Sequence, residues 1–460
     1  MINRKSLLFA IIIVFLTHSL YSQQYKRLSD KGYKKEVVNT ICKLLQSKYV
    51  IAENAEKYAA DFKKKFASGY YDSCDDAKAF TKMVTADLVS ITHDKHINFR
   101  VIESSAVGEQ AESALHHPVR YHLLRAKENT GFYKLEWIEN NIGYLDIRRF
   151  YSFDQAKDMI IAAMKFLANS NAIIIDVREN GGGSGDYLSS YFLPYPTQLT
   201  GWYSREDDWL MQFWTIKDIG TEPLLDTPVF ILTSDRTFSA AESFACDMKV
   251  RKRAIIIGDS TKGGAHSVDL YKIDDQFEIY ISTERAINPI TGENWEGVGV
   301  IPDILVPSEA ALDTAIVLAR EAGEEYARAK EEKLKQAVAK MQIHLDRAER
   351  FYRSNKKADA DAALDSVFQI GATVGLINEF FIDVLAYNYL SDKNDQILYA
   401  ILKKRIELFP KSVSAYERLA SIYHSKGKKE LALQYFQKVL ELEPDNRNAA
   451  RMINRIREDK

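Results

Sequence analysis

The sequence predicts an α/β core followed by an all-helical repeat region. Three apolar segments of strand length, 172–176, 228–233 and 254–258, alternate with helical patterns in the middle of the chain. That alternation is typical of a parallel sheet with crossover helices. Beyond about residue 378 the pattern repeats with a period of 34 residues, which indicates stacked helix pairs.

Composition and charge exclude some classes of partner. The chain has 460 residues, of which 46% are hydrophobic, so it can form several domains with sizeable cores. Its 62 basic and 64 acidic residues give a formal charge of −2. This balance argues against nucleic acid or an anionic membrane as the principal partner.

The first 22 residues have the pattern of a secretory signal. Asn3-Arg4-Lys5 is followed by a short apolar stretch, 7–16, and by a polar run that ends at Ser22. The stretch is too short to span a bilayer comfortably. We therefore expect residues 1–22 to be removed, and an exported, periplasmic or secreted protein with no stable membrane insertion.

Residues 23–115 predict a helical cap domain. Apolar residues recur there at helical spacing, at Val37, Ile41, Leu44, Leu45 and Tyr49. Cys42 and Cys74 both fall in this domain, and the sequence leaves open whether they pair.

Ser239 stands where an apolar strand, 228–233, turns into a helix. A hydroxyl at such a corner has the positive end of a helix dipole beside it, and backbone N–H groups follow that can hold an oxyanion. This favours a nucleophile. The same residues also fit a capping box, in which Ser239 caps the helix and Glu242 reaches back to it. On this segment alone both interpretations stand.

A glycine run follows another strand. Asp176-Val-Arg178-Glu-Asn180 leads into Gly181-Gly182-Gly183, and an apolar helix is expected around 187–192. Glycines let backbone N–H groups approach a carbonyl or anion closely. The run does not match a phosphate-binding fingerprint, and a plain turn is the alternative. The aromatic-rich segment 191–214 either lines a cleft or packs over the core, and packing is the more usual outcome.

The order of motifs resembles a known family. From about Gly143 to Asp303 the chain is similar to the tail-specific (C-terminal processing) serine peptidases, their tricorn-type branch and the interphotoreceptor retinoid-binding protein modules. The matching motifs are Gly143-Tyr144-Leu145, Asp176 to Gly183, Ser239 to Glu242, Thr261 to Gly264, and Glu296 to Asp303.

The resemblance implies a crotonase-like (ClpP/crotonase) spiral core of β-β-α units over residues 116–308. Ser239 matches the nucleophile of the family. The oxyanion hole would be the amide of Ala240 together with that of Gly182 or Gly183. Which glycine donates stays open.

The resemblance also suggests the base. The lysine of the tail-specific branch aligns with Gly264, so a Ser-Lys dyad is absent. The tricorn-like branch uses a histidine and a glutamate, and these match His96 and Glu296. The family's relay serine before the histidine is Lys95 here.

Three other residues are candidate bases. His266, in the glycine loop after Ser239, is the rival base, and His93 ranks third. Lys262 lies two residues from the lysine position of the family, but it would have to be desolvated and aimed correctly to act as a base. His93-x-x-His96 also permits a metal interpretation, but no carboxylate or cysteine stands at a recognisable ligand spacing. We expect no metal and no cofactor.

After Pro307 the composition changes. A charged, alanine-rich connecting helix is expected over 309–344, and tetratricopeptide-like repeats over 345–460. The copy at about 412–445 has Gly427, Ala432 and Phe436 at the repeat's positions. Such repeats bind a protein partner or act as a spacer.

Together these features predict an exported serine endopeptidase that acts on a peptide or protein substrate, with Ser239, His96 and Glu296 as catalytic residues. The alternative is a non-catalytic binding module on the same fold.

Overall fold

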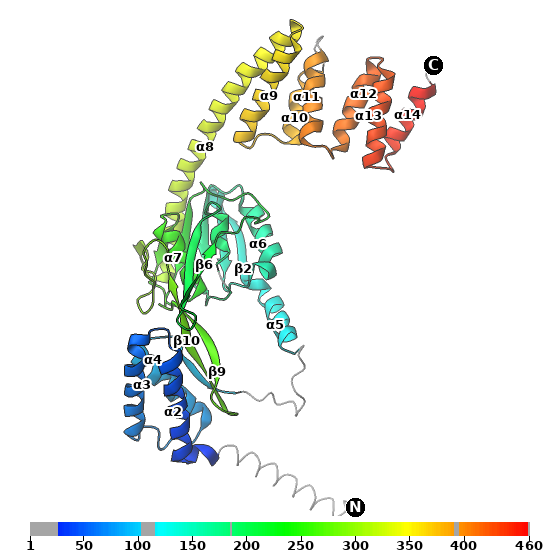
Figure 1. Ribbon diagram of the computed structural model, residues 1–460. Coiled ribbons are helices and arrows are strands. Elements are labelled where there is room, and N and C mark those ends of the chain that lie inside the picture. The colour runs from blue at the N-terminus through cyan, green and yellow to red at the C-terminus, as the bar shows by residue number, and fades with distance from the viewer. Residues whose placement is uncertain (1–25, 103–115, 185, 391–394, 459–460) are drawn as a thin grey trace, which may run out of the picture. The chain divides into compact units, whose positions relative to one another are not determined.

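The computed structural model forms two compact units, which divide between Tyr326 and Ala327. It describes residues 26–102, 116–184, 186–390 and 395–458 (Figure 1). The expected signal segment 1–22 lies outside the described residues. Among the helices that are described, none is both long and apolar enough to cross a bilayer.

A six-stranded sheet forms the centre of the first unit. Its strands, in spatial order, are β11 (Ile304–Leu305), β8 (Ile255–Gly258), β7 (Val229–Thr233), β4 (Ala172–Asp176), β3 (Ile142–Ile147) and β2 (Phe132–Ile138). Neighbours from β11 to β3 pair in parallel, and β2 pairs antiparallel with β3. The three apolar segments of the sequence are β4, β7 and β8, and the α/β core is confirmed.

Helices cover both faces of this sheet. Alternate strand residues point to opposite faces. Ile175 packs in the core formed with α6 (Phe153–Leu167) and α7 (Ala240–Val250), whereas Ile174 packs with the first turns of α8 (Ser308–Arg353).

An antiparallel sheet connects this core to the N-terminal helices. Its strand order is β1 (Asn98–Val101), β10 (Phe277–Ile287), β5 (Gln198–Ser204) and β6 (Trp209–Trp214), with β9 (His266–Lys272) also on β10. Figure 1 shows three helices beside this ribbon: α2 (Lys31–Lys48), α3 (Ala52–Ala67) and α4 (Ala77–Thr92). Their core includes strand residues from β1 and β10.

Shorter elements complete the first unit. They are α5 (His116–Lys127) and the 3₁₀ turns η1 (Lys26–Ser29), η2 (Asn129–Gly131), η3 (Glu139–Asn141) and η4 (Leu188–Tyr191). The apolar helix expected around 187–192 was wrong, because the structure has only the turn η4 there. Pro194 lacks an N–H and disfavours helical backbone at the residue before it.

Two further expectations are settled by burial and bonding. In the aromatic-rich segment, Trp209, Phe213 and Trp214 are 41% to 64% exposed, so core packing was wrong for them. They lie on β6, an edge strand. Cys42 and Cys74 are both free.

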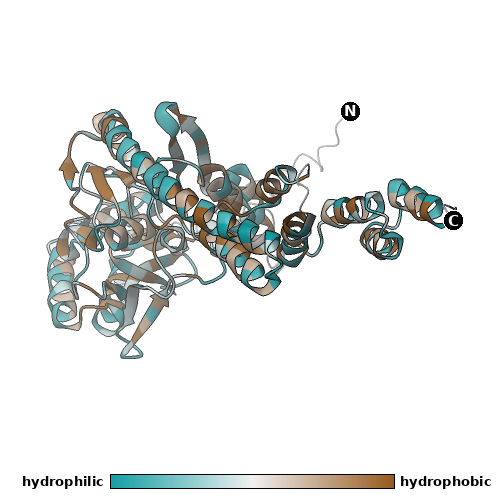
Figure 2. Ribbon diagram, turned by 90° about the horizontal axis from the view of Figure 1, so that it is seen from above, coloured by the Kyte–Doolittle hydropathy of each residue, from teal (hydrophilic) through white to brown (hydrophobic). Residues whose placement is uncertain are grey.

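The second unit is entirely helical in the part that is described. Beside the end of α8 it contains α9 (Lys357–Thr373), α10 (Glu379–Tyr387), α11 (Asp395–Leu408), α12 (Val413–Ser425), α13 (Lys429–Leu442) and α14 (Arg447–Glu458). In Figure 2 the helices next to the C-terminal mark show apolar and polar sides, as stacked helix pairs require. Ala432 and Phe436 are fully buried, and Gly427 turns between α12 and α13 with a φ of 69°.

Candidate active site

Ser239 lies at the corner between β7 and α7. Three hydrogen bonds tie this corner to the segment after β4: Ser234 Oγ to the Arg178 carbonyl (2.6 Å), Thr237 Oγ1 to the Val177 carbonyl (2.8 Å), and the Phe238 N–H to the Asn180 carbonyl (3.0 Å). Short hydroxyl side chains can bond backbone groups in this way, and they allow the chain to turn sharply before the helix begins.

The backbone of Ser239 is strained. Its φ is 57° and its ψ is −120°, a region that side-chain-bearing residues rarely adopt. Ser152 is a useful comparison, because it also forms a capping box, with Gln155, at the start of α6. Its φ of −60° and ψ of 154° are those of an ordinary N-cap. Capping therefore does not require the conformation of Ser239, which costs about 1–3 kcal/mol.

Glu242 joins the nucleophile corner to the next loop. Its fully buried carboxylate accepts hydrogen bonds from the Ser239 N–H (2.8 Å), Thr261 Oγ1 (2.5 Å), the Gly263 N–H (2.6 Å) and the Gly264 N–H (2.9 Å). Burial raises the pKa of Glu242, although these four donors act in the opposite direction. The glutamate of the capping box thus also holds the Thr-x-Gly-Gly loop in place.

The glycine run packs directly against Ser239. A Cβ on Gly182, whose φ is 94°, would lie 2.8 Å from the Ser239 Cβ, so any larger residue would displace the serine. The Gly182 N–H donates to Asn180 Oδ1 at 2.8 Å and is therefore already engaged. Gly183 and Ala240 both line the cavity in front of Ser239.

His96 lies in the loop between α4 and β1. Its ring stacks on Phe238 with 4.4 Å between ring centroids. Its two ring nitrogens are buried and have no hydrogen-bond partner in the described structure. A Cβ on Gly264 would lie 2.6 Å from the His96 Cε1. It would lie 2.1 Å from the Phe238 Cε2. The glycine, which aligns with the lysine of the tail-specific branch, therefore leaves the space that the imidazole and the Phe238 ring occupy.

A buried ionic network lies behind His96. Asp94 accepts hydrogen bonds from the His266 Nδ1 (2.7 Å), the His96 backbone N–H (2.9 Å) and the Tyr49 hydroxyl (3.2 Å). Asp94 Oδ1, the oxygen that accepts from the His96 backbone N–H, is also 3.8 Å from the His96 Nδ1. Glu296 Oε2 accepts from the Ala265 N–H at 2.5 Å and is 3.8 Å from the His266 Nδ1.

The pKa values of these groups differ in direction. Burial lowers the pKa of His96 to about 4. Burial also acts to lower the pKa of His266, but the hydrogen bond and charge of Asp94 outweigh it, and the pKa is raised. Burial raises the pKa of Glu296 to about 7. At neutral pH His96 is thus neutral, whereas His266, beside two carboxyl groups, keeps its proton to a higher pH than a free histidine does.

The side chains of Asp94, His266 and Glu296 also have a spacing that suits a metal ion, since their ligand atoms lie within 4.8 Å of one another. Asp94 and His266 are in direct hydrogen-bond contact at 2.7 Å, however, so these two side chains already satisfy each other.

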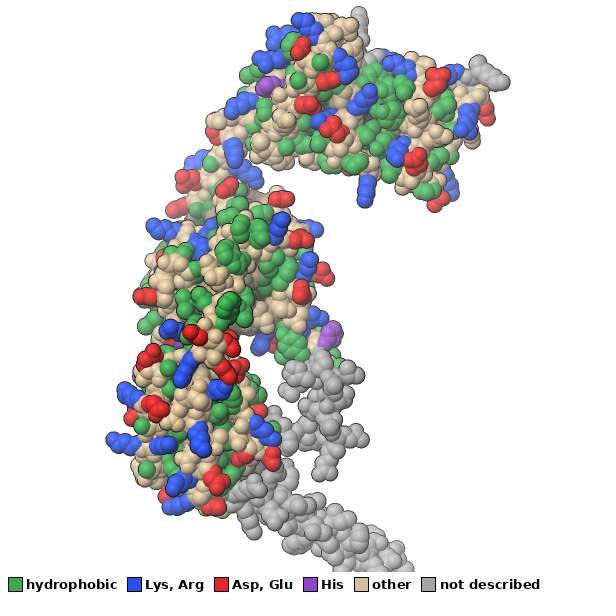
Figure 3. All heavy atoms as spheres, viewed as in Figure 1, with side chains coloured by type: hydrophobic (Ala, Val, Ile, Leu, Met, Phe, Trp, Pro, Cys, Tyr) green, Lys and Arg blue, Asp and Glu red, His purple; other side chains and the backbone are tan. Residues whose placement is uncertain are grey.

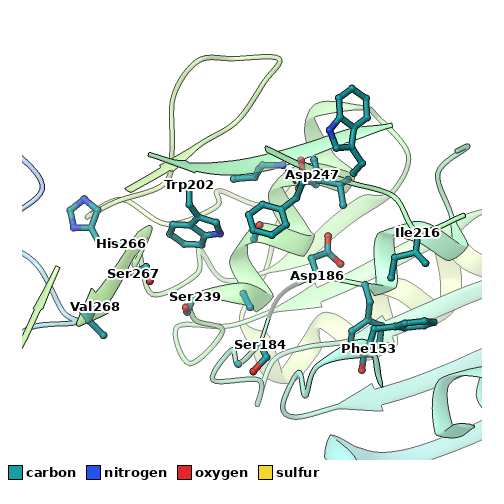
Figure 4. Close-up of a pocket in the computed structure, with 18 of the residues that line it drawn as sticks. Phe153, Ser184, Asp186, Trp202, Ile216, Ser239, Asp247, His266, Ser267 and Val268 are labelled. Carbon is teal, nitrogen blue, oxygen red and sulfur yellow. Dashed lines mark hydrogen bonds between the residues drawn. The ribbon is translucent and has the colours of Figure 1, made fainter. Parts of the chain in front are cut away.

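A cavity of about 470 Å³ opens in front of Ser239. Both His96 and His266 line it, together with aromatic side chains of β5 and β6. In the view of Figure 4, Ser239 lies between His266 on one side and Asp186 on the other. The cavity is large enough to hold a side chain or a short segment of a substrate.

The two lower-ranked candidate bases both lie on the surface. His93 is exposed at the end of α4, and Lys262 is exposed with its Nζ 4.8 Å from the centre of the Phe238 ring. Asp94 was not among the predicted site residues, although it stands between His93 and His96 in the sequence, two residues before His96. An Asp at that spacing often bonds the backbone two residues on, as this one does.

Comparisons with known proteins agree with the fold and the motifs. The model of peptidase family S41 matches residues 141–306, and that of the N-terminal domain of peptidase S41 in eukaryotic IRBP matches 31–130. A tetratricopeptide repeat model matches 413–446, which covers α12 and α13.

Curated relatives match the core only. The chloroplastic carboxyl-terminal-processing peptidase 1 of Arabidopsis thaliana is 25% identical over 178 residues, which cover 37% of this chain and 35% of that protein. The carboxyl-terminal-processing protease of Picosynechococcus is 25% identical over 173 residues, 36% of this chain and 40% of the relative.

Solved structures of the same kind are also similar. The photosystem II D1 C-terminal processing protease has a TM-score of 0.30 and 22% identity, with coverage of 37% of this chain and 43% of that one. The tricorn protease has a TM-score of 0.40 and 12% identity, with coverage of 66% and 37%. The two S41 models thus stand in the order that the motifs require, and residues 141–306 belong to peptidase family S41.

Proposed function

We propose that the protein is an exported serine endopeptidase that hydrolyses peptide bonds through an acyl-enzyme on Ser239. The observation that carries the proposal is the strained backbone of Ser239, which the ordinary cap at Ser152 does not share. Strain of this kind persists where the surrounding structure holds it, and it clusters at active sites. A sharp strand-to-helix turn also exposes a serine hydroxyl to substrate.

His96 is the general base in this proposal. A base must have a free lone pair, and the pKa of His96 keeps its imidazole neutral at neutral pH. Because the pKa of His266 is raised instead, a smaller share of its rings than of the His96 rings is in the neutral form that can accept the serine proton. Asp94, 3.8 Å from the His96 Nδ1, stabilises the imidazolium that forms when His96 takes the proton.

The proposed reaction begins at Ser239. Ser239 Oγ attacks the peptide carbonyl as its proton passes to His96, and the tetrahedral oxyanion is held by the amides of Ala240 and Gly183. Gly183 is preferred to Gly182 because the Gly182 N–H already donates to Asn180. The His96 imidazolium returns the proton to the leaving amine, and a water molecule then hydrolyses the acyl-enzyme by the same steps.

Glu296 supports the base indirectly. It accepts from the Ala265 N–H and faces His266, so it helps to hold the ring that bonds to Asp94. The match to the carboxyl-terminal-processing peptidases covers less than half of the length of those relatives. We therefore propose peptide or protein substrates from the chemistry of the site, not from the relatives. We further propose that the repeat unit binds a protein partner, and that the pattern of residues 1–22 directs export.

The first test is labelling of the purified protein with a fluorophosphonate probe, followed by peptide mapping. We expect one adduct on Ser239 that Ser239→Ala lacks and Ser152→Ala retains. A folded protein that stays unlabelled would refute the nucleophile and favour a binding module.

The pH dependence of labelling identifies the base. If His96 is the base, lowering the pH slows labelling only near the pKa of about 4. If His266 is the base, lowering the pH slows labelling while the pH is still above 6.5, because the pKa of His266 is raised. An acid limb above pH 6.5 that His96→Ala leaves in place would overturn the assignment.

A further inference from the structure

The cavity in front of Ser239 contains two carboxyl groups at one end. Ser243 and Asp247 line it one and two turns along α7 from Ser239, since positions four apart share a helix face. Asp186 comes from the loop after the glycine run. In Figure 4 Asp186 and Asp247 lie near each other, on the side of Ser239 away from His266.

The two carboxylates differ in their partners. Asp247 forms an ion pair with Arg251 at 2.7 Å and accepts from the Thr200 N–H (3.0 Å) and Asn288 Nδ2 (3.2 Å). Asp186 accepts from the N–H (3.1 Å) and the hydroxyl (2.5 Å) of Ser189. Neither group of Ser189 is charged. Within the described residues Asp186 has no ion pair.

The position of Asp186 makes its ionised form unfavourable without a cation. Burial, and then the neighbouring charge of Asp247, raise its pKa to about 7. A buried carboxylate that lacks a counter-charge is costly. A cation that enters the cavity would restore the ionised form and form a charge-assisted hydrogen bond with it.

The walls of the cavity suit a long side chain with a charged end. They are formed by Trp202, Phe213, Trp214 and Ile216. Aromatic faces attract lysine and arginine cations, and their aliphatic stems pack along apolar surface. Figure 3 shows hydrophobic side chains gathered over the front of the first unit, where Figure 1 labels β6. Of the exposed aromatic residues of β6, Phe213 and Trp214 line the cavity.

We propose that Asp186 determines substrate specificity, by binding the side chain of a lysine or arginine on the residue whose carbonyl Ser239 attacks. The inference rests on the proposed peptidase function. An apolar side chain in the same place would exclude water from a carboxyl group without pairing it. A neutral wall would not distinguish a cationic from an apolar side chain in this way. Nor would a carboxylate that is already paired, as Asp247 is with Arg251.

The test compares internally quenched peptides that differ at one residue, which is arginine, lysine, norleucine or citrulline. Mass spectrometry identifies the bond that is cleaved. A hydrogen bond to a charged group contributes about 1.5–3 kcal/mol, so we expect kcat/KM for arginine to exceed that for citrulline by about 10- to 100-fold. In Asp186→Asn, which keeps an oxygen to accept from Ser189, this ratio should fall to about one.

Asp76→Asn is the matched control. Asp76 caps α4 by accepting from the Ala79 N–H at 2.7 Å, far along the chain from the cavity, and its substitution should leave the ratio as it is. A preference for norleucine in the unmodified protein would overturn the inference. Equal losses on arginine and citrulline in Asp186→Asn would also do so, because they would show a structural role only.

A binding measurement separates this inference from the proposed function. Calorimetry with Ser239→Ala compares the arginine and citrulline peptides without turnover. If the arginine peptide binds at least about tenfold more tightly than the citrulline peptide, the role proposed for Asp186 is supported. If the unmodified protein then hydrolyses no peptide, only the proposed peptidase function fails. Equal affinities overturn the inference whether or not the unmodified protein cleaves peptides.

Discussion

Replacement of Ser239 by glycine should stabilise the first unit, although it removes the nucleophile. Glycine adopts a positive φ without steric cost, so Ser239→Gly relieves about 1–3 kcal/mol of strain. It loses about 0.5–1 kcal/mol through the greater freedom of glycine in the unfolded chain and a few tenths through the weaker cap. The net gain in the free energy of unfolding is about 1 kcal/mol.

Ser152→Gly is the matched control, because Ser152 caps α6 with an extended backbone. Glycine relieves nothing there, and the variant should lose about 1 kcal/mol. The two variants should therefore differ by about 2 kcal/mol, which corresponds to roughly 4 °C in the transition of a unit of this size.

Calorimetry of the full chain measures this difference. Phe436→Ala removes a side chain from the core of the repeat unit and should lower the midpoint of that unit's transition only. This variant therefore identifies which transition belongs to the repeat unit. If Ser239→Gly lowers the transition of the first unit as much as Ser152→Gly does, Ser239 stores no strain and the principal argument for a nucleophile is lost.

Three other predictions concern the network behind the nucleophile. Gly264→Ala places a methyl group 2.6 Å from the His96 Cε1, and fluorophosphonate labelling should slow at least about tenfold while circular dichroism shows an intact fold. Asp94→Asn removes the charge that raises the pKa of His266, and titration followed by NMR should place that pKa below its value in the unmodified protein; an unchanged pKa would contradict the network. The pKa of Glu296 is raised to about 7 from a reference of 4.5, so the folded state holds an extra proton between these values, and stability falls as pH rises through this window. Denaturant titrations from pH 5 to 8 should show a smaller decrease in Glu296→Gln, and an identical decrease would show that Glu296 does not titrate there.

The sequence was sufficient for features that depend on local order. Strand, corner and helix around Ser239 follow one another directly, and the glycine run follows a strand, so apolar patterning and turn residues predicted both. The tetratricopeptide repeat was also predictable, because each helix pair has its own spacing of small and apolar residues.

Long-range contacts explain what was missed. Asp94 and His266 are 172 residues apart, and neither residue has a local pattern that identifies the other as its partner. The exposure of Phe213 and Trp214 depends on β6 being the edge of a sheet, which strand order decides and composition does not. The role proposed for Asp186 likewise depends on a cavity that its own loop forms together with β5, β6 and α7.

The register of β10 has a consequence for the time at which the proposed enzyme becomes active. Asn98 to Val101, directly after the loop of His96, pair with Tyr280 to Phe277, whereas Glu284 to Ile287 on the same strand pair with β5. The base therefore reaches its place only after the chain has been synthesised and released as far as β10. Contacts this distant in sequence form late and slowly. A newly made chain would therefore stay inactive until β10 has been made and has paired with both β1 and β5.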